Sequence, residues 1–295
     1  MLRSFHYRDF PVERLIEAKR GRSVSVCLPA RNEEATVGQV VGTIRAELME
    51  RHSLVDELVV IDDGSTDGTA ASAAVAGADV VAASLILPDY GDEGGKGQAM
   101  WKGVHVTSGD LVVFCDADVR NFGTHFVTGL LGPLLLRDDV ALVKGFYHRP
   151  LDGRPGEGGR VTELVARPLI SLLFPHLAPL MQPLAGECAA RREVLEQVPF
   201  VEGYGVDLGL LIDVSKRWGA GSIVQCDLGE RVHRNRPLAE LAPQATAVLQ
   251  LALTRAGLVS AAEVRALLPP GKDPVLVAVG ERPPLAGVPA YRKSA

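Results

Sequence analysis

Short apolar runs recur along the first half of the chain, separated by polar and glycine-rich turns. Each run has the length of a strand that is buried on both faces of a sheet. After the first run, apolar residues share one face at helical spacing from Val37 to Leu48. Strands that alternate with helices predict an α/β fold with a mostly parallel, doubly wound sheet. The expected strands span 23–28, 57–61, 79–83, 111–114 and 141–147, with further helices near 98–106 and 125–136.

The second half has a more helical pattern. Residues 163–181 are apolar but interrupted by prolines, which predicts short helices that pack in the core or at a dimer contact. Residues 184–192 are expected to enter another helix, and the tail from Pro283 to Ala295 is expected to be disordered. A helix from 203, a strand at 221–227 and a helix over 238–256 complete the expected elements. We divide the chain into a lead-in of 1–22, halves of 23–150 and 151–257, and an extension of 258–295.

Two carboxylates, Asp116 and Asp118, follow the apolar run 111–114. Positions i and i+2 leave a strand on the same side, so the two charges repel unless a cation is near. Mg²⁺ is typically held by one or two carboxylates and substrate phosphates. Ligands of open α/β sheets bind beyond the carboxyl ends of the strands. A pair of loop-capping aspartates explains this segment almost equally well when it is taken alone.

Three other stretches contain residues that could bind a ligand. Asp62-Asp-Gly-Ser-Thr-Asp-Gly68 follows the second strand, and its carboxylates suit a base or ribose hydroxyls, although an ordinary Asp-Gly turn is the simpler interpretation. Gly91-Asp-Glu-Gly-Gly-Lys-Gly97 lacks the P-loop spacing, yet Lys96 and its backbone N–H groups suit a diphosphate. Arg160 and Thr162 stand where a glycine-rich loop enters a helix, which suits an anion, with a solvated loop charge as the alternative.

Composition narrows the class of protein. The 295 residues carry a formal net charge of −5, which argues against a general nucleic-acid binder. Four scattered cysteines are expected to be buried free thiols rather than disulfides or zinc ligands. The N-terminus lacks the apolar core of a signal peptide, and residues 164–186 contain too many prolines and charges for a membrane span. We therefore expect a cytoplasmic protein, with a homodimer preferred.

Five motifs now coincide in order: Pro29-Ala-Arg-Asn-Glu-Glu34, the Asp62–Gly68 turn, Gly94-Gly-Lys-Gly97, Asp116-Ala-Asp118 and the late His233. Together they resemble the nucleotide-sugar glycosyltransferases of the A-type fold. Gly159-Arg-Val-Thr-Glu-Leu164, Pro183-Leu-Ala-Gly-Glu187, Gly203-Tyr-Gly-Val-Asp207 and His233-Arg-Asn-Arg-Pro-Leu238 look like the family of glucosyl-3-phosphoglycerate synthases. The resemblance covers about residues 23–255. It makes 23–150 the nucleotide-sugar-binding half, with a Rossmann-like sheet, and 151–257 the acceptor-binding half.

The resemblance implies transfer of glucose, with retention, from UDP-glucose to the 2-hydroxyl of 3-phosphoglycerate, in methylglucose lipopolysaccharide or glucosylglycerate biosynthesis. It places Pro29, Ala30, Glu33, Asp63, Ser65, Lys96, Asp116 and Ala117 at the nucleotide sugar. It places Gly159, Arg160, Thr162 and Asn235 at the acceptor, and Asp118 and His233 on Mg²⁺ or Mn²⁺. Asp207 and Glu187 are the nearest candidates for a sugar contact or a nucleophile, and Asp207 stands where the pattern leads us to expect Glu.

Other functions remain open at this point. The related mannosyl-3-phosphoglycerate synthases use GDP-mannose, and the residues do not distinguish the two sugars or the two bases. A glycosyltransferase with a polyprenyl-phosphate acceptor is expected to carry a hydrophobic anchor. A nucleotidyltransferase usually has a glycine-rich signature directly after the first strand, where this chain has Pro29-Ala-Arg-Asn-Glu33. An inactive sugar-nucleotide-binding module is expected to have lost Asp118 or His233, and both are present.

Overall fold

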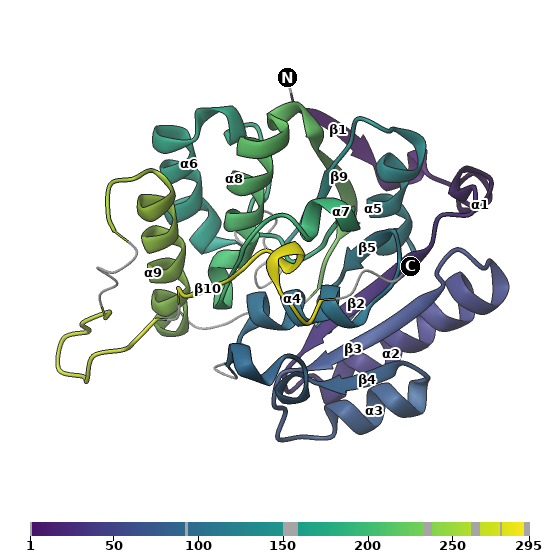
Figure 1. Ribbon diagram of the computed structural model, residues 1–295, viewed down its shortest axis with the longest axis horizontal. Coiled ribbons are helices and arrows are strands. Elements are labelled where there is room, and N and C mark those ends of the chain that lie inside the picture. Colours follow the sequence, from purple (N-terminus) through teal and green to yellow (C-terminus); the bar gives the residue numbers. More distant parts are fainter. Residues whose placement is uncertain are drawn as a thin grey trace.

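An eight-stranded sheet organises the chain in a computed structural model, which describes residues 2–91, 94–149, 159–232, 238–260, 266–277 and 279–291. The strand order is β1-β9-β6-β7-β5-β2-β3-β4, so the sheet runs from β1 near the top of Figure 1 to β4 near the bottom. The strands are β1 (Arg3–His6), β2 (Val24–Ala30), β3 (Glu57–Asp62), β4 (Asp79–Ala82), β5 (Leu111–Phe114), β6 (Leu142–His148), β7 (Cys188–Arg191) and β9 (Ile223–Glu230). All neighbouring pairs are parallel except β5–β7 and β6–β7. The expected α/β fold with a mostly parallel sheet is confirmed.

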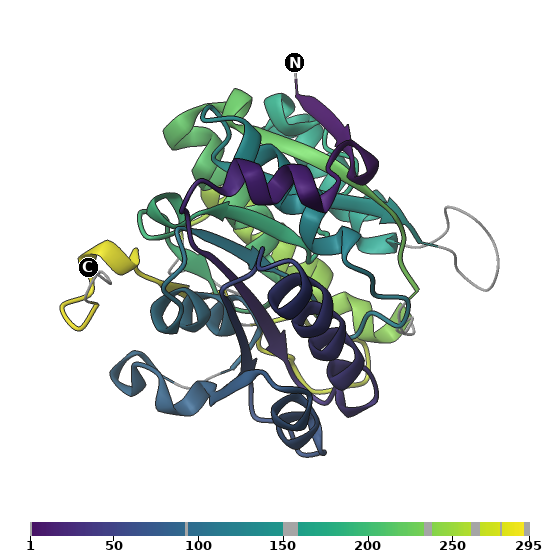
Figure 2. The same ribbon diagram turned by 90° about the vertical axis from the view of Figure 1, so that its right-hand side faces the viewer.

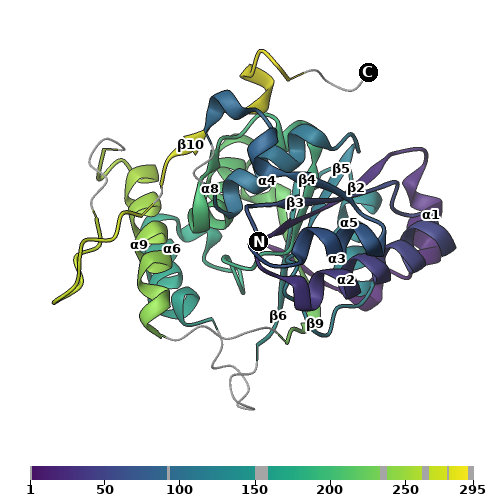
Figure 3. The same ribbon diagram turned by 90° about the horizontal axis from the view of Figure 1, so that it is seen from below.

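Helices cover both faces of this sheet (Figures 2 and 3). The described helices are α1 (Val12–Lys19), α2 (Glu34–Thr43), α3 (Thr69–Ala76), α4 (Lys96–Val106), α5 (His125–Leu136), α6 (Arg167–Leu173), α7 (Arg192–Leu195), α8 (Val206–Trp218) and α9 (Leu238–Arg255). Because successive strand residues point to opposite faces, Cys27 enters the core beneath α4 and α8, whereas Val26 and Leu28 enter the core beneath α2 and α5. Apolar residues on both faces explain why the strands read as continuous apolar runs.

The chain changes direction at β2. It runs outward from β2 through β3 to β4, then returns to the other side of β2 as β5. A crevice forms where strand order reverses, beyond the carboxyl ends of the two strands. Pro29 and Ala30 end β2, and Asp116 follows β5, so the topology brings two of the predicted motifs to the same place.

One strand of the second half was missed, and one expectation is wrong. Residues 184–192 enter the helix α7 at Arg192, as expected, but residues 188–191 first form the antiparallel strand β7 between β5 and β6, which was not predicted. Ala189 and Ala190 favour a helix in isolation, but two unsatisfied strand edges override that preference. The tail also packs as far as Tyr291: β10 (Glu281–Arg282) pairs with β8 (Phe200–Val201), and Leu285 is completely buried. The last four residues lie outside the described part.

The lead-in and the cysteines behave largely as expected. Leu15 anchors α1 in the core, whereas Ile16 is 37% exposed. The lead-in also contributes β1, which pairs with β9 and extends the sheet. All four cysteines are free and buried, and burial raises the pKa of Cys188 to about 11. Across the described ranges, no helix combines the length and the apolar character needed to cross a membrane.

Candidate active site

A cavity of about 720 Å³ lies at the reversal point between β2 and β5. The start of α4 lines it beside the start of α8, and residues 159–162 and α9 also contribute to its lining. Twelve of the residues predicted for the site line this cavity: Pro29, Ala30, Glu33, Asp63, Lys96, Asp116, Ala117, Asp118, Gly159, Arg160, Thr162 and Asp207. Ser65 and Glu187 are not among the lining residues, and His233 and Asn235 lie outside the described residues.

The loop after β2 is held by the turn after β3. Asn32 adopts a positive φ of 58°, and its side-chain oxygen accepts a hydrogen bond from the Thr66 N–H at 2.8 Å. The Asn32 N–H donates to the Ser65 hydroxyl at 3.0 Å. Asp63 accepts a bond from the Gly95 N–H at 2.7 Å, which ties this turn to the start of α4. Ser65 therefore supports the wall of the cavity from behind, while Asp63 lines it.

Asp116 sits between two cations. The Lys96 ammonium donates to one carboxylate oxygen at 2.9 Å, and the Arg231 guanidinium lies 2.9 Å from the other. Burial alone raises the pKa of Asp116, but these two cations outweigh it and hold the pKa well below its usual value. Burial lowers the pKa of Lys96, yet Asp116 and Asp207 outweigh that effect and keep its pKa above the usual value. Both groups are therefore charged at neutral pH.

The guanidinium of Arg231 is the centre of the arrangement. It contacts Asp118 at 2.5 Å, the Tyr147 hydroxyl at 2.6 Å and Glu187 at 3.2 Å. Glu187 is completely buried, and its second oxygen accepts a bond from the Tyr147 hydroxyl at 2.6 Å. We expected Glu187 beside the sugar, but it lies behind the cavity wall and is a counter-ion of Arg231. Burial raises the pKa of Glu187 above its usual value, although Arg231 acts against this.

A second buried ion pair holds Asp207 in the first turn of α8. Lys144 of β6 donates to one of its oxygens at 2.7 Å, and Lys96 lies 3.5 Å from the other. The side chains of Lys144 and Asp207 are only 3% and 7% exposed. Each oxygen of the Asp207 carboxylate already faces an ammonium group. Asp207 is therefore poorly suited to attack a sugar, but it is well placed to accept hydrogen bonds from the hydroxyls of a sugar.

The Asp116–Asp118 pair is suited to a divalent cation. Arg231 bridges the two carboxylates, which shows that they share a cation-binding position, and carboxylate oxygens are the ligands that Mg²⁺ and Mn²⁺ prefer. Among the described residues no three metal-ligating side chains converge. His233, which we expected to hold the cation together with Asp118, falls outside them.

Another part of the cavity lining contains the residues that we expected to bind an anion. Gly159 has a φ of 84°, and Arg160 and Thr162 follow it at the start of a helical segment. Thr162 is only 3% exposed, although it lines the cavity. Arg149 and Arg231 approach the same space from β6 and from the end of β9. A small molecule with phosphate and carboxylate groups would therefore meet several guanidinium groups in the same cavity as Lys96.

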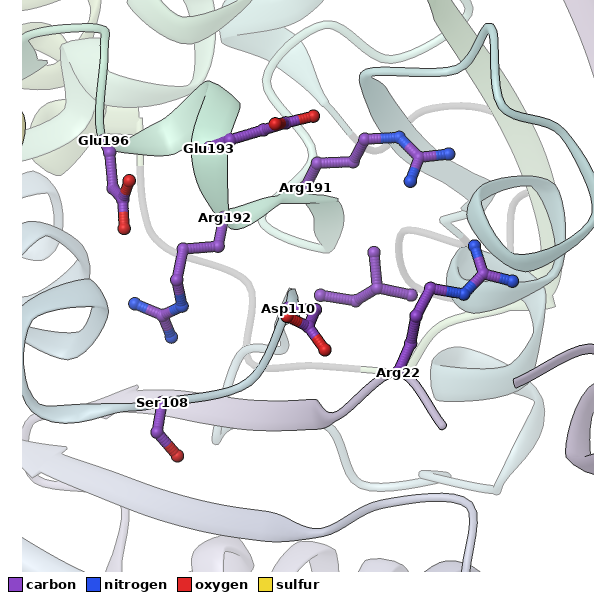
Figure 4. A pocket seen from close by; sticks show the side chains of 8 residues that line it. Arg22, Ser108, Asp110, Arg191, Arg192, Glu193 and Glu196 are labelled. Carbon is purple, nitrogen blue, oxygen red and sulfur yellow. The ribbon is translucent and has the colours of Figure 1, made fainter. Parts of the chain in front are cut away.

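A smaller cavity of about 370 Å³ also contains arginines, at the amino ends of β2 and β5 (Figure 4). Arg22 donates to the Leu135 carbonyl at 2.8 Å, and Arg192 donates to the Val104 carbonyl at 2.8 Å. These carbonyls end α5 and α4, where cations are favourable. The arginines of this cavity therefore stabilise helix ends.

Two important residues were missed in the sequence. Lys144 interrupts the apolar run 141–147, and a charge inside a buried strand requires a buried partner. The lysine inside this apolar run therefore predicts a buried ion pair, but it does not identify Asp207 as the partner. Arg231 was not among the residues predicted for the site. Its burial of 97% depends on the distant residues Asp116 and Glu187, which no local pattern reveals.

Gly97 allows α4 to approach β8, and we predict that Gly97→Ala disrupts the site. A Cβ at this position falls 1.8 Å from the Val201 carbonyl oxygen. The expected cost is about 1–3 kcal/mol of folding stability or more, together with a displaced Lys96. Thermal unfolding and activity measure the two effects. Gly42→Ala is the matched control, because its Cβ meets nothing within 4 Å and the change is expected to stabilise α2 by about 0.5–1 kcal/mol. Equal stability of the two variants contradicts the prediction.

Comparisons with known proteins agree with this geometry. A family model described as glycosyl transferase family 2 matches residues 25–198. The glucosyl-3-phosphoglycerate synthase of Mycolicibacterium smegmatis is 50% identical over 259 residues, which cover 86% of this chain and 84% of that protein. The enzyme of the same name from Petrotoga mobilis is 44% identical over 260 residues, covering 86% and 80%.

Solved structures agree as well. The crystal structure of glucosyl-3-phosphoglycerate synthase from Mycobacterium tuberculosis with Mn²⁺, UDP-glucose and phosphoglyceric acid has a TM-score of 0.89 at 44% identity, over 96% of this chain and 98% of that one. A complex of that protein with Mg²⁺ and UDP has a TM-score of 0.86, at 44% identity over the same shares of the two chains.

Proposed function

We propose that this chain transfers glucose from UDP-glucose to 3-phosphoglycerate. The premise is that the chain belongs to glycosyl transferase family 2 and, within that family, to the glucosyl-3-phosphoglycerate synthases. The finer assignments, retention at the anomeric carbon and attack by the 2-hydroxyl, are part of the proposal. The observation that carries it is that one cavity is lined both by Lys96 and the Asp116–Asp118 pair and by Arg160 and Thr162.

Residues at the ends of β2 and β5 would hold the sugar nucleotide. Pro29, Ala30, Glu33 and Asp63 would surround uridine, with Ser65 holding their loop in place. Asp116 and Ala117 would lie along the ribose side, and Lys96 would stabilise the diphosphate. Asp118 and His233 would hold Mg²⁺ or Mn²⁺, which supplies positive charge to the leaving diphosphate when bound.

Another part of the cavity lining would hold the acceptor. Gly159, Arg160, Thr162 and Asn235 would bind its phosphate and carboxylate, so that its hydroxyl points towards the anomeric carbon. The bond from that carbon to the diphosphate breaks, and its electron pair stays on the phosphate oxygen. The acceptor oxygen then bonds to the carbon from the same face, and its proton passes to the leaving phosphate. The engaged carboxylates of Asp207 and the buried Glu187 favour this route over a covalent intermediate. A glycosyl adduct trapped on either residue contradicts it.

The proposal predicts UDP release that depends on both acceptor and metal. UDP-glucose is incubated with the protein in Mg²⁺, with and without 3-phosphoglycerate, and the released UDP is measured. We expect release only with both present, and its loss in EDTA because the negative diphosphate then leaves without a divalent cation. Binding of UDP without any release points to another acceptor or to a binding module.

A parallel series with GDP-mannose tests the mannosyl alternative, and a polyprenyl phosphate tests the lipid alternative. Faster turnover with either contradicts the proposed substrates.

We also propose a homodimer and a cytoplasmic location. The exposed apolar side chains of Leu164, Leu172 and Met181 gather around α6, where a second copy could cover them. Free, buried cysteines suit a reducing compartment. Analytical ultracentrifugation tests the first proposal, and cell fractionation tests the second.

A further inference from the structure

We infer that the C-terminal strap, residues 279–291, is part of the machinery that positions the sugar nucleotide, and that Arg282 is its positioning residue. This inference rests on the proposed function. Arg282 does not line the cavity. Its guanidinium instead connects the two segments that carry Lys96 and Asp207.

The strap is docked along its whole described length. β10 pairs antiparallel with β8, and the Glu202 N–H donates to the Gly280 carbonyl at 2.8 Å. Trp101 of α4 donates to the Pro283 carbonyl at 2.8 Å. Leu285 and Val288 are 0% and 3% exposed. Figures 1 and 3 show the strap, in yellow, passing beside α4. It therefore holds β8 and α4 at the same time.

Those two segments meet backbone to backbone beside Lys96. A Cβ on Gly95 would lie 3.1 Å from the backbone of Gly203, and one on Gly97 would overlap the Val201 carbonyl. The segment around 201–203 continues directly into α8, which begins at Val206 and carries Asp207 in its first turn. Any shift between the two segments therefore changes the 3.5 Å contact between Lys96 and Asp207.

Arg282 bridges the two segments with one nitrogen. Its Nη2 lies 2.9 Å from Glu202, next to β8, and 2.9 Å from the Gln98 side-chain oxygen of α4. The Gln98 amide donates in turn to the Gly91 carbonyl at 2.7 Å, in the loop that leads to Lys96. Gln98 is completely buried, and the side chains of Arg282 and Glu202 are 11% and 10% exposed. This network is shielded from water, so its geometry is well defined.

The location of the strap predicts that replacing Arg282 affects the sugar nucleotide and not the acceptor. The strap pairs with β8 and accepts a hydrogen bond from α4, whereas Arg160 and Thr162 lie in the separate segment 159–162. Arg282→Met should therefore raise the KM for UDP-glucose and the Kd for UDP in Mg²⁺, and lower kcat, each by about tenfold, because small misplacements of a charged group are costly. The KM for 3-phosphoglycerate should change less than about twofold, because the segment that holds the acceptor is untouched.

The experiment compares Arg282→Met and three further variants with the wild-type chain. Arg282→Lys keeps the charge beside Glu202 and should recover part of the UDP affinity. Gln98→Met breaks the link to α4 while β10 stays paired, and it gives the test if Arg282→Met does not fold. Arg255→Met is the control, because Arg255 pairs with Asp213 at 2.9 Å and with Glu281 in the strap but does not reach α4. It should lower the unfolding temperature without changing the UDP affinity.

Steady-state kinetics with each substrate varied, UDP titration calorimetry and thermal unfolding supply the readouts. Loss of UDP affinity in Arg282→Met and Gln98→Met, with the KM for 3-phosphoglycerate unchanged, supports the inference. Equal changes for both substrates, or lower unfolding temperatures with unchanged UDP affinity, overturn it. A wild-type chain that binds UDP but transfers no glucose contradicts the proposed function instead, while the calorimetry still tests Arg282.

Discussion

Replacing Lys96 by methionine is expected to lower kcat by about two to three orders of magnitude, because removing one preorganised electrostatic contact to a developing charge commonly costs that much. The ammonium lies 2.9 Å from Asp116 and 3.5 Å from Asp207, at the start of α4. In the proposed reaction it stabilises the diphosphate as the glucosyl bond breaks. Methionine has a similar length, so the change removes charge with little loss of volume.

The fold is expected to survive this change. Asp116 keeps Arg231 at 2.9 Å, and Asp207 keeps Lys144 at 2.7 Å, so neither buried carboxylate loses its last cation. Kinetics with UDP-glucose and 3-phosphoglycerate, together with thermal unfolding, separate the two effects. Lys272→Met is the control, since Lys272 is exposed and does not line the cavity. A folded Lys96→Met variant with kcat within tenfold of the wild type contradicts the proposal that Lys96 stabilises the leaving diphosphate.

Replacing Lys144 by methionine is expected to have the largest effect on stability, a loss approaching about 3–5 kcal/mol, because it breaks a buried ion pair and leaves the Asp207 carboxylate with only the longer contact to Lys96. Asp207 is 5% exposed, and Lys144 provides its shorter contact, 2.7 Å against 3.5 Å from Lys96. The remaining carboxylate also draws Lys96 away from the diphosphate. We therefore expect lower kcat in addition to lower stability. Chemical denaturation measures the free energy of unfolding.

The double variant Lys144→Met with Asp207→Asn is the control, because it also removes the negative charge of the Asp207 carboxylate. Removing both members of the pair leaves no isolated ion, so the double variant should be more stable than Lys144→Met alone. Its activity should stay low, because Asp207 is proposed to contact the sugar. If Lys144→Met loses less than about 1 kcal/mol of stability, the pair contributes no more than an exposed ion pair does, which contradicts the prediction.

Much of the fold follows from local sequence patterns. The run 111–114 is apolar at every position and its neighbours are largely apolar, a pattern typical of strands buried on both faces, so the positions of these strands along the chain were predictable. Asp116 and Asp118 follow such a run directly, and strand geometry alone places them at the edge where ligands bind. Lys96 was predictable in the same way, since glycines and a lysine precede a helix.

Other features depend on contacts between distant residues. Residues 188–191 form a strand because β5 and β6 leave two edges to be paired, which overrides the helical preference of alanine. The proline-rich tail packs because β8 and α4 present an edge and an apolar surface to it.

By itself, the sequence determined the α/β class, the motif order and the acidic pair, because these depend on neighbouring residues. Only the tertiary structure decided that Arg231 joins Asp116, Asp118 and Glu187, that Lys144 neutralises Asp207, and that Arg282 connects α4 to β8. The physical reason is that a buried charge must find its partner across the fold, and local spacing does not name that partner.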